Sequence, residues 1–183
     1  RAAYGRLSQL LTLGKRRAKK DECHLFLNDL LHGRIFEAGK DQVLILITPD
    51  ILDSNFKEIL LNIIKKIKKD LYLSVSYIYY GDDKFRISLL SDLASSLSIP
   101  LVATNDVHAH YVGRKVLQDV MTCIRERCNI YEAGYLLHGN EERHLKSGDE
   151  MARLFEEYPD AIKNTVRIAD QCRFSLEELR YEY

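Results

Sequence analysis

The spacing of apolar residues alternates between two periods over the first 110 residues. Apolar positions recur every three or four residues in three stretches, which predicts helices over 4–19, 55–69 and 84–97. Between them, apolar or alternating runs predict strands over 43–47, 71–80 and 101–104. Strands that alternate with helices build a parallel sheet with right-handed crossovers. We therefore expect an α/β fold in this part of the chain, a half-barrel or open sheet, with the strand at 43–47 buried.

Beyond residue 110 the pattern is helical throughout. Helices are predicted over 113–127, 150–158 and 160–172, and a loop with three glycines lies between the first two. Pro159 stands where proline is favoured, at the first position of a helix. An all-helical C-terminal segment is therefore expected.

Composition narrows the class of protein. The 183 residues are 46% hydrophobic, and 27 Lys and Arg balance 27 Asp and Glu, so contact with DNA would have to be local. No apolar run approaches the roughly 20 residues that cross a bilayer, and no secretory signal opens the chain. Four cysteines without a CxxC pair are typical of reduced thiols, so we expect a cytoplasmic protein without membrane contact. The start at Arg1 indicates a piece of a longer chain.

A candidate metal site follows the third predicted strand. Residues 101–110 read LVATNDVHAH, so the strand is followed by Asp106 and His108. Active sites gather at the carboxyl ends of parallel strands, and Asp-x-His places two metal-ligand types on one side of an extended segment. The alternative is an exposed, hydrogen-bonded loop. His110 is either a spare ligand or a surface residue. The other histidines are interpreted as structural or exposed: His24, His32, His138 and His144.

The same segment carries a family resemblance. Residues 104–108, TNDVH, resemble the last metal-binding motif of the PHP (polymerase and histidinol phosphatase) domain at the front of bacterial DNA polymerase III alpha subunits. Further motifs are similar to the error-prone branch of that family: YGRLSQLLTLG (4–14), LQDVMTCIR (117–125), ERHLKS (142–147), EMARLF (150–155) and CRFSLEELRYEY (172–183). The chain is thus identified as resembling a bacterial error-prone DNA polymerase.

The resemblance implies a fold and a domain division. It implies the later part of a seven-stranded PHP-type βα barrel over residues 1–147, and a helical connection toward the polymerase palm over 148–183. Of the family's metal ligands only Asp106 and His108 match, so zinc or manganese would occupy a degenerate, incomplete site. Magnesium would serve the polymerase of the parent chain. No catalytic or other cofactor-binding residue is expected here.

Three functions are compared. The first is a structural, non-polymerising part of an error-prone DNA-directed DNA polymerase, a nucleotidyltransferase for DNA replication, repair and translesion synthesis in damage-induced mutagenesis. Its partners would be DNA, deoxynucleoside triphosphates, and possible sliding-clamp and mutagenesis accessory proteins. The second is a metal-dependent phosphoesterase or 3'-5' exonuclease that uses Asp106 and His108. The third is a protein-docking module, which an exposed apolar patch after Val112 would favour.

Overall fold

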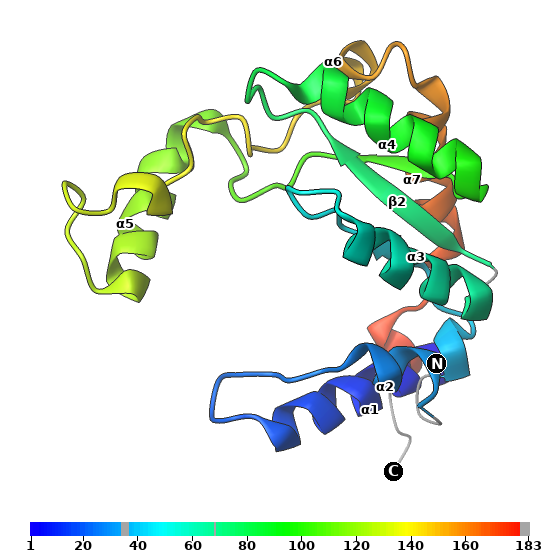
Figure 1. Cartoon of the computed structure of the whole chain (residues 1–183). Helices are drawn as coiled ribbons and strands as arrows, with labels where there is room; N and C mark the ends of the chain where they lie inside the picture. The colour runs from blue at the N-terminus through cyan, green and yellow to red at the C-terminus, as the bar shows by residue number, and fades with distance from the viewer. Residues whose placement is uncertain (34–36, 68, 180–183) are drawn as a thin grey trace. The chain divides into compact units, whose positions relative to one another are not determined.

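The computed structural model describes residues 1–33, 37–67 and 69–179 (Figure 1). The chain divides into two compact units: unit 1 comprises residues 1–72 and 166–183, and unit 2 comprises residues 73–165. The predicted domain boundary between residues 147 and 148 lies inside unit 2. A functional division there remains a prediction.

Unit 1 opens with the amphipathic helix that the sequence predicts. Its complete elements are α1 (Ala2–Arg17), α2 (Leu27–Leu31), the 3-10 helix η1 (Glu37–Gly39), β1 (Leu44–Leu46), α3 (Ser54–Lys66) and the 3-10 helix η4 (Leu176–Leu179). At the end of α1, Arg17 Nη1 lies 2.6 Å from Asp29 Oδ2, an oxygen that also accepts the Phe26 N–H at 2.9 Å. The hydrogen bond from Arg17, and to a smaller extent that from the Phe26 N–H, hold the pKa of Asp29 below its usual value.

Helix α3 shows how local sequence sets an element. Asp53 caps its first turn, because its Oδ1 accepts the Phe56 N–H at 2.7 Å. The helix buries Leu60 and Ile63 and leaves its lysines exposed, as predicted. It ends at Lys66, earlier than the predicted residue 69; Lys68, which that prediction included, lies outside the described residues.

The sheet is small and open, with the strand order β1-β2-β3. β2 (Leu71–Ser76) and β3 (Leu101–Thr104) run parallel, with Leu73 opposite Leu101 and Ser76 opposite Thr104. The helix α4 (Asp83–Leu97) connects them as the crossover that the alternating pattern predicts. The α/β class is therefore confirmed, and the barrel remains a proposal.

Two strand predictions were wrong in detail. The strand predicted as buried, β1, is an edge strand of the described sheet: Ile45 is 42% exposed, and within the described residues the strand pairs on one side only. The strand predicted to alternate, β2, is buried at every position from residue 71 to 75. As the central strand it is covered on both faces, so its side chains do not divide into a buried set and an exposed set. It also ends at Ser76, and residues 77–80 are irregular.

Unit 2 packs α4 onto the sheet. Its buried apolar side chains include Leu73, Val75, Ile87, Leu90 and Val102. The start of α4 is fixed by Asp83, which is 7% exposed and whose carboxylate accepts the N–H groups of Ile78 and Tyr80, each at 2.8 Å. This carboxylate satisfies backbone donors in the turn that leads from β2 into the helix.

The chain after β3 is helical, as predicted. The elements are the 3-10 helix η2 (Val112–Arg114), α5 (Lys115–Glu126), the 3-10 helix η3 (Gly134–Leu136), α6 (Gly148–Leu154) and α7 (Pro159–Gln171). Pro159 is the first residue of α7, in agreement with the prediction. The helix predicted over 150–158 ends at Leu154. Residues 180–183 of the last resemblance motif lie outside the described residues.

No helix in the described part of the chain has both the length and the apolar character that a bilayer crossing requires.

Candidate functional site

The predicted site residues, Asp106 and His108, follow the carboxyl end of β3, beside the end of β2. The strand ends are joined by a hydrogen bond of 2.7 Å between the Ser76 and Thr104 hydroxyl groups. Asn105 follows β3 and is 7% exposed. Its Nδ2 donates to the backbone oxygens of Glu142, at 3.2 Å, and of His144. A buried amide therefore ties the end of β3 to a segment almost 40 residues further along the chain.

That segment, Asn140–Lys146, is termed the 140–146 loop. Asn140 Nδ2 donates to the Ile78 carbonyl at 2.7 Å, after the end of β2. On the β3 side, the His108 N–H donates to the Arg143 carbonyl at 2.8 Å, and Ala109 forms an isolated parallel bridge with His144. The loop is thus held by hydrogen bonds to residues that follow two neighbouring strands.

Asp106 is at the centre of this arrangement. Its backbone has a positive φ of 42°, a conformation that Asp and Asn tolerate better than most residues. Its Oδ1 lies 3.5 Å from His108 Nε2, and its Oδ2 contacts Nη1 of Arg143. The Asp106 side chain is 51% exposed, whereas that of Arg143 is only 15% exposed. The ion pair therefore joins a half-exposed carboxylate to a mostly buried guanidinium.

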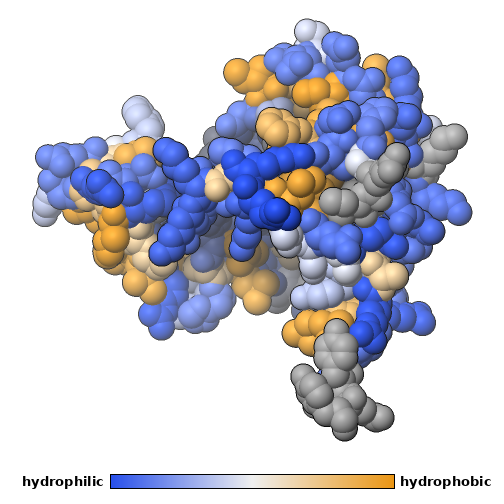
Figure 2. Space-filling model, turned by 90° about the horizontal axis from the view of Figure 1, so that it is seen from below, coloured by the Kyte–Doolittle hydropathy of each residue, from blue (hydrophilic) through white to orange (hydrophobic). Residues whose placement is uncertain are grey.

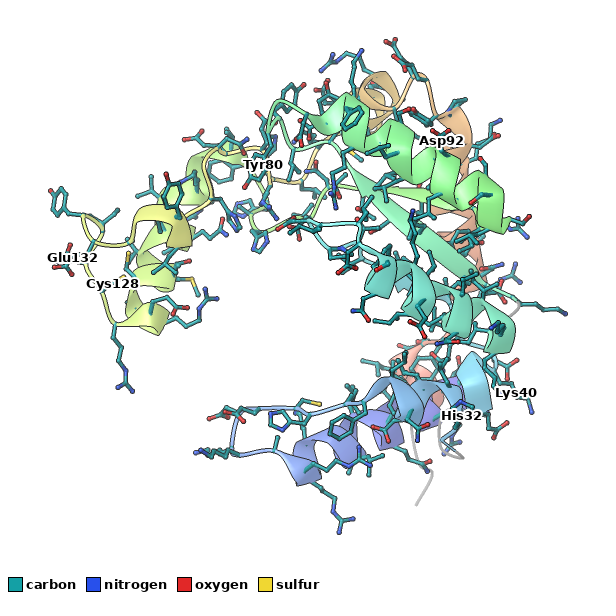
Figure 3. All side chains as sticks on the ribbon, viewed as in Figure 1. His32, Lys40, Tyr80, Asp92, Cys128 and Glu132 are labelled. Carbon is teal, nitrogen blue, oxygen red and sulfur yellow. The ribbon has the colours of Figure 1, made fainter. Side chains whose placement is uncertain are left out.

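Arg143 also lies near an aromatic ring. Its guanidinium carbon lies 5.7 Å from the ring centroid of Tyr80, which Figure 3 labels and which belongs to the turn before α4. Its Nε is buried and has no hydrogen-bond partner in the described part of the chain. Because arginine keeps its charge in proteins, the buried guanidinium needs the Asp106 carboxylate.

His138, which the sequence pattern indicated to be structural or exposed, lies beside His108. Its ring lies 4.9 Å from that of His108, centroid to centroid, with the planes tilted by 54°. Burial, and then the neighbouring His108, lower the pKa of His138, which favours the neutral imidazole. Thirty positions separate the two histidines, and no local pattern signals their contact. His110 packs against Tyr111, and His144 is hydrogen-bonded to the Glu141 carbonyl at 2.9 Å.

The donor atoms fit an ion-pair network better than a metal site. The two predicted ligands lie together, with Asp106 Oδ1 3.5 Å from His108 Nε2, and the other carboxylate oxygen, Oδ2, contacts the Arg143 guanidinium. A divalent cation at Asp106 would have to displace a guanidinium, which retains its charge. Within the residues that the structure describes, no three or more His, Cys, Asp or Glu side chains are placed to hold a metal ion. Metal binding by Asp106 and His108 remains a prediction.

A second surface feature lies on α5. Its Lys115 and Asp119 side chains form a partly buried ion pair of 2.6 Å. The apolar side chains of this helix are exposed by 43–72%: Val116, Leu117, Val120, Met121 and Ile124. Figure 2 shows apolar side chains reaching the surface among the hydrophilic ones. The exposed apolar patch expected after Val112 for a docking module is therefore present on α5.

Comparison with known proteins identifies the relatives of this chain. No family model matches it. It is 45% identical over 189 residues to the error-prone DNA polymerase of Bradyrhizobium sp. (strain ORS 278), and 40% identical over 183 residues to that of Caulobacter vibrioides. Error-prone DNA polymerase 1 of Agrobacterium fabrum is 38% identical over 183 residues. Each match covers 100% of this chain and 16% of the relative. The chain is therefore homologous, over its whole length, to one segment of the error-prone DNA polymerases.

Proposed function

We propose that this chain is a structural, non-polymerising segment of an error-prone DNA-directed DNA polymerase. The identity of 38–45% to such polymerases along the whole chain carries the proposal. The parent protein would copy damaged templates in damage-induced mutagenesis, with DNA, deoxynucleoside triphosphates and magnesium as its substrates and cofactor. It would act in the cytoplasm. Residues 1–147 would belong to a PHP-type domain, and residues 148–183 would lead toward the palm.

The ion pair between Asp106 and Arg143 supports a structural role for the site. A metal-dependent phosphoesterase needs a carboxylate free to bind a cation, and here one oxygen of Asp106 contacts the Arg143 guanidinium. The pair instead links the end of β3 to the 140–146 loop, with further hydrogen bonds from Asn105 and His108. We therefore favour the structural role over the phosphoesterase alternative.

A chimeric polymerase tests this proposal. The alignment with the Caulobacter vibrioides enzyme spans 183 residues, equal to the length of this chain, so the chain can replace the aligned segment. We expect the chimera to extend a primer on an undamaged template and across an abasic site. A chimera with Leu73→Asp, which places a charge at a position with 0% exposure, serves as the unfolded control. A folded chimera without DNA synthesis would contradict the proposal.

We also propose that the apolar face of α5 packs against another part of the same polymerase. An exposed face of five large apolar side chains is costly in water, and about five sixths of each relative lies outside the matched segment. The N–H groups of α5 should then exchange with solvent more slowly in the chimera than in the isolated chain. Protection that arises only when a sliding clamp or accessory protein is added would assign the face to that partner instead.

A further inference from the structure

The charges of this chain are unevenly distributed, although they sum to zero. The first 20 residues contain seven Lys and Arg and no Asp or Glu. Residues 1–72 and 166–183, which form unit 1, contain 17 basic and 13 acidic residues. Residues 73–165, which form unit 2, contain 10 basic and 14 acidic residues. The positive charge is therefore concentrated in unit 1, and most densely around α1.

The basic residues at the end of α1 differ in their surroundings. Arg17 is held by Asp29 at 2.6 Å and lies 5.4 Å from the ring centroid of Phe26. The other four side chains are exposed, and in the part of the chain that the structure describes no carboxylate lies within 4.0 Å of them. These four residues are termed the α1 basic cluster: Lys15, Arg16, Lys19 and Lys20. The cluster therefore keeps its full charge at the surface.

Helix stability does not account for four uncompensated cations. The carboxyl end of a helix carries a partial charge of about −0.5, which one or two cations balance. Lys19 and Lys20 lie beyond Arg17, the last residue of α1, so their positions are not explained by the stability of this helix. An external anion would balance the charge that the helix end does not balance.

A hollow in the surface adjoins the cluster. It has a volume of about 280 Å³ and is lined by α1 residues alone: Gln9, Thr12, Leu13, Arg16 and Arg17. Arg16 thus belongs both to the basic cluster and to the wall of the hollow, beside the amide of Gln9. Arg, Lys and uncharged polar side chains of this kind make most protein contacts with DNA phosphates. Gln9 therefore adds an uncharged donor near the cluster, in a hollow whose lining is otherwise mainly apolar.

We propose that the α1 basic cluster binds the sugar-phosphate backbone of DNA, without recognising bases. A duplex presents one negative charge about every 1.7 Å along its axis, so it can neutralise all four cations at once. The choice of DNA as the anion rests on the proposed function, because a polymerase acts on DNA. The site itself is assigned from the charge, exposure and shape of α1.

Salt dependence of DNA binding by the 183-residue chain tests this inference. With four phosphate contacts, the logarithm of the binding constant should fall with the logarithm of salt concentration with a slope of about −3.6. Binding of a fluorescein-labelled 20-base-pair duplex, followed by anisotropy, should weaken about 100-fold between 50 and 200 mM KCl. The variant K15Q/R16Q/K19Q/K20Q should lose most of this slope and bind at least about tenfold more weakly at 50 mM.

A second variant separates a local site from net charge. The substitutions K57Q/K65Q/K66Q/K69Q remove four exposed lysines on and just after α3, also in unit 1, and change the net charge equally. This variant should keep the slope within about one unit of the unmodified chain. Glutamine is a good helix former, and circular dichroism will show that both variants keep their helices.

Two results would overturn the inference. One is equal weakening of DNA binding in both variants, which would reduce the effect to net charge. The other is an unmodified chain that fails to bind the duplex at 50 mM KCl. Neither result depends on DNA synthesis by the chimera. A chimera without synthesis would contradict the proposed function even if the isolated chain binds DNA as predicted.

Discussion

Asp106→Asn should destabilise the 140–146 loop more than Arg143→Met does, although both changes break the same ion pair. Asparagine, like aspartate, tolerates the positive φ of 42° at this position, so the substitution tests charge rather than backbone strain. It leaves the Arg143 guanidinium without its carboxylate in a position where the side chain is 15% exposed. The change therefore leaves a mostly buried charge unpaired.

The expected costs in stability follow from the exposed fractions of the Arg143 and Asp106 side chains. Removing one partner of a fully buried pair costs about 3–5 kcal/mol, and the partial exposure of Arg143 reduces the cost of Asp106→Asn to about 2 kcal/mol. Arg143→Met keeps an unbranched apolar side chain against Tyr80 and leaves Asp106, which is 51% exposed, accessible to water. We expect a cost of about 1 kcal/mol. The double variant should cost no more than Arg143→Met alone, so the two effects are not additive.

Hydrogen exchange provides the local assay. The N–H groups of His108 and Ala109 donate to the Arg143 carbonyl, and that of Leu145 donates to the Ala109 carbonyl. A loss of about 2 kcal/mol should speed their exchange about 30-fold in Asp106→Asn, with the double variant below that rate. Buried amides of β2 serve as internal controls. Equal and additive losses of stability in the two single variants would refute the reasoning. Unchanged exchange rates of these three amides in Asp106→Asn would refute it as well.

Three further predictions concern other parts of the chain. Asp83→Ala should lower the free energy of unfolding by about 1 kcal/mol in urea titrations followed by circular dichroism, because it leaves two partly buried N–H groups without an acceptor; Asp82→Ala, without a capping bond, is the matched control. The stability that Asp29 contributes should be present above pH 3.8, the ordinary pKa of its carboxyl, and lost as the pH falls through the lowered folded pKa. The stability difference between the unmodified chain and Asp29→Asn should therefore disappear in acid; a difference that grows as the pH falls would contradict this sign. Elemental analysis should give no stoichiometric zinc or manganese in the chain; metal that is lost in both Asp106→Ala and His108→Ala would revive the phosphoesterase alternative.

Local patterns predicted the elements better than their environments. The strand at residues 101–104 and the start of α7 at Pro159 agree with the sequence analysis, because β-branched runs and proline act locally. The exposure of β1 and the two-sided burial of β2 depend on the order of strands in the sheet, which periodicity does not encode.

The site was predicted only in part, because local sequence patterns do not show contacts between distant segments. Asp106 and His108 stand at a strand end, and this position made them candidates. Their partners Arg143 and His138 come from a loop more than 25 residues away, and only the fold brings them together. The sequence therefore located the carboxylate, whereas its pairing with a guanidinium became evident only in the structure.

Primer extension by the chimeric polymerase tests the structural role most directly. The chimera with the unmodified chain is compared with one that carries Asp106→Asn and Arg143→Met together, a change that removes the ion pair without leaving a buried charge. We predict that both chimeras synthesise DNA at rates within a few fold of each other. A folded double variant that has lost DNA synthesis would show that Asp106 and Arg143 take part in the reaction, and would contradict the structural role.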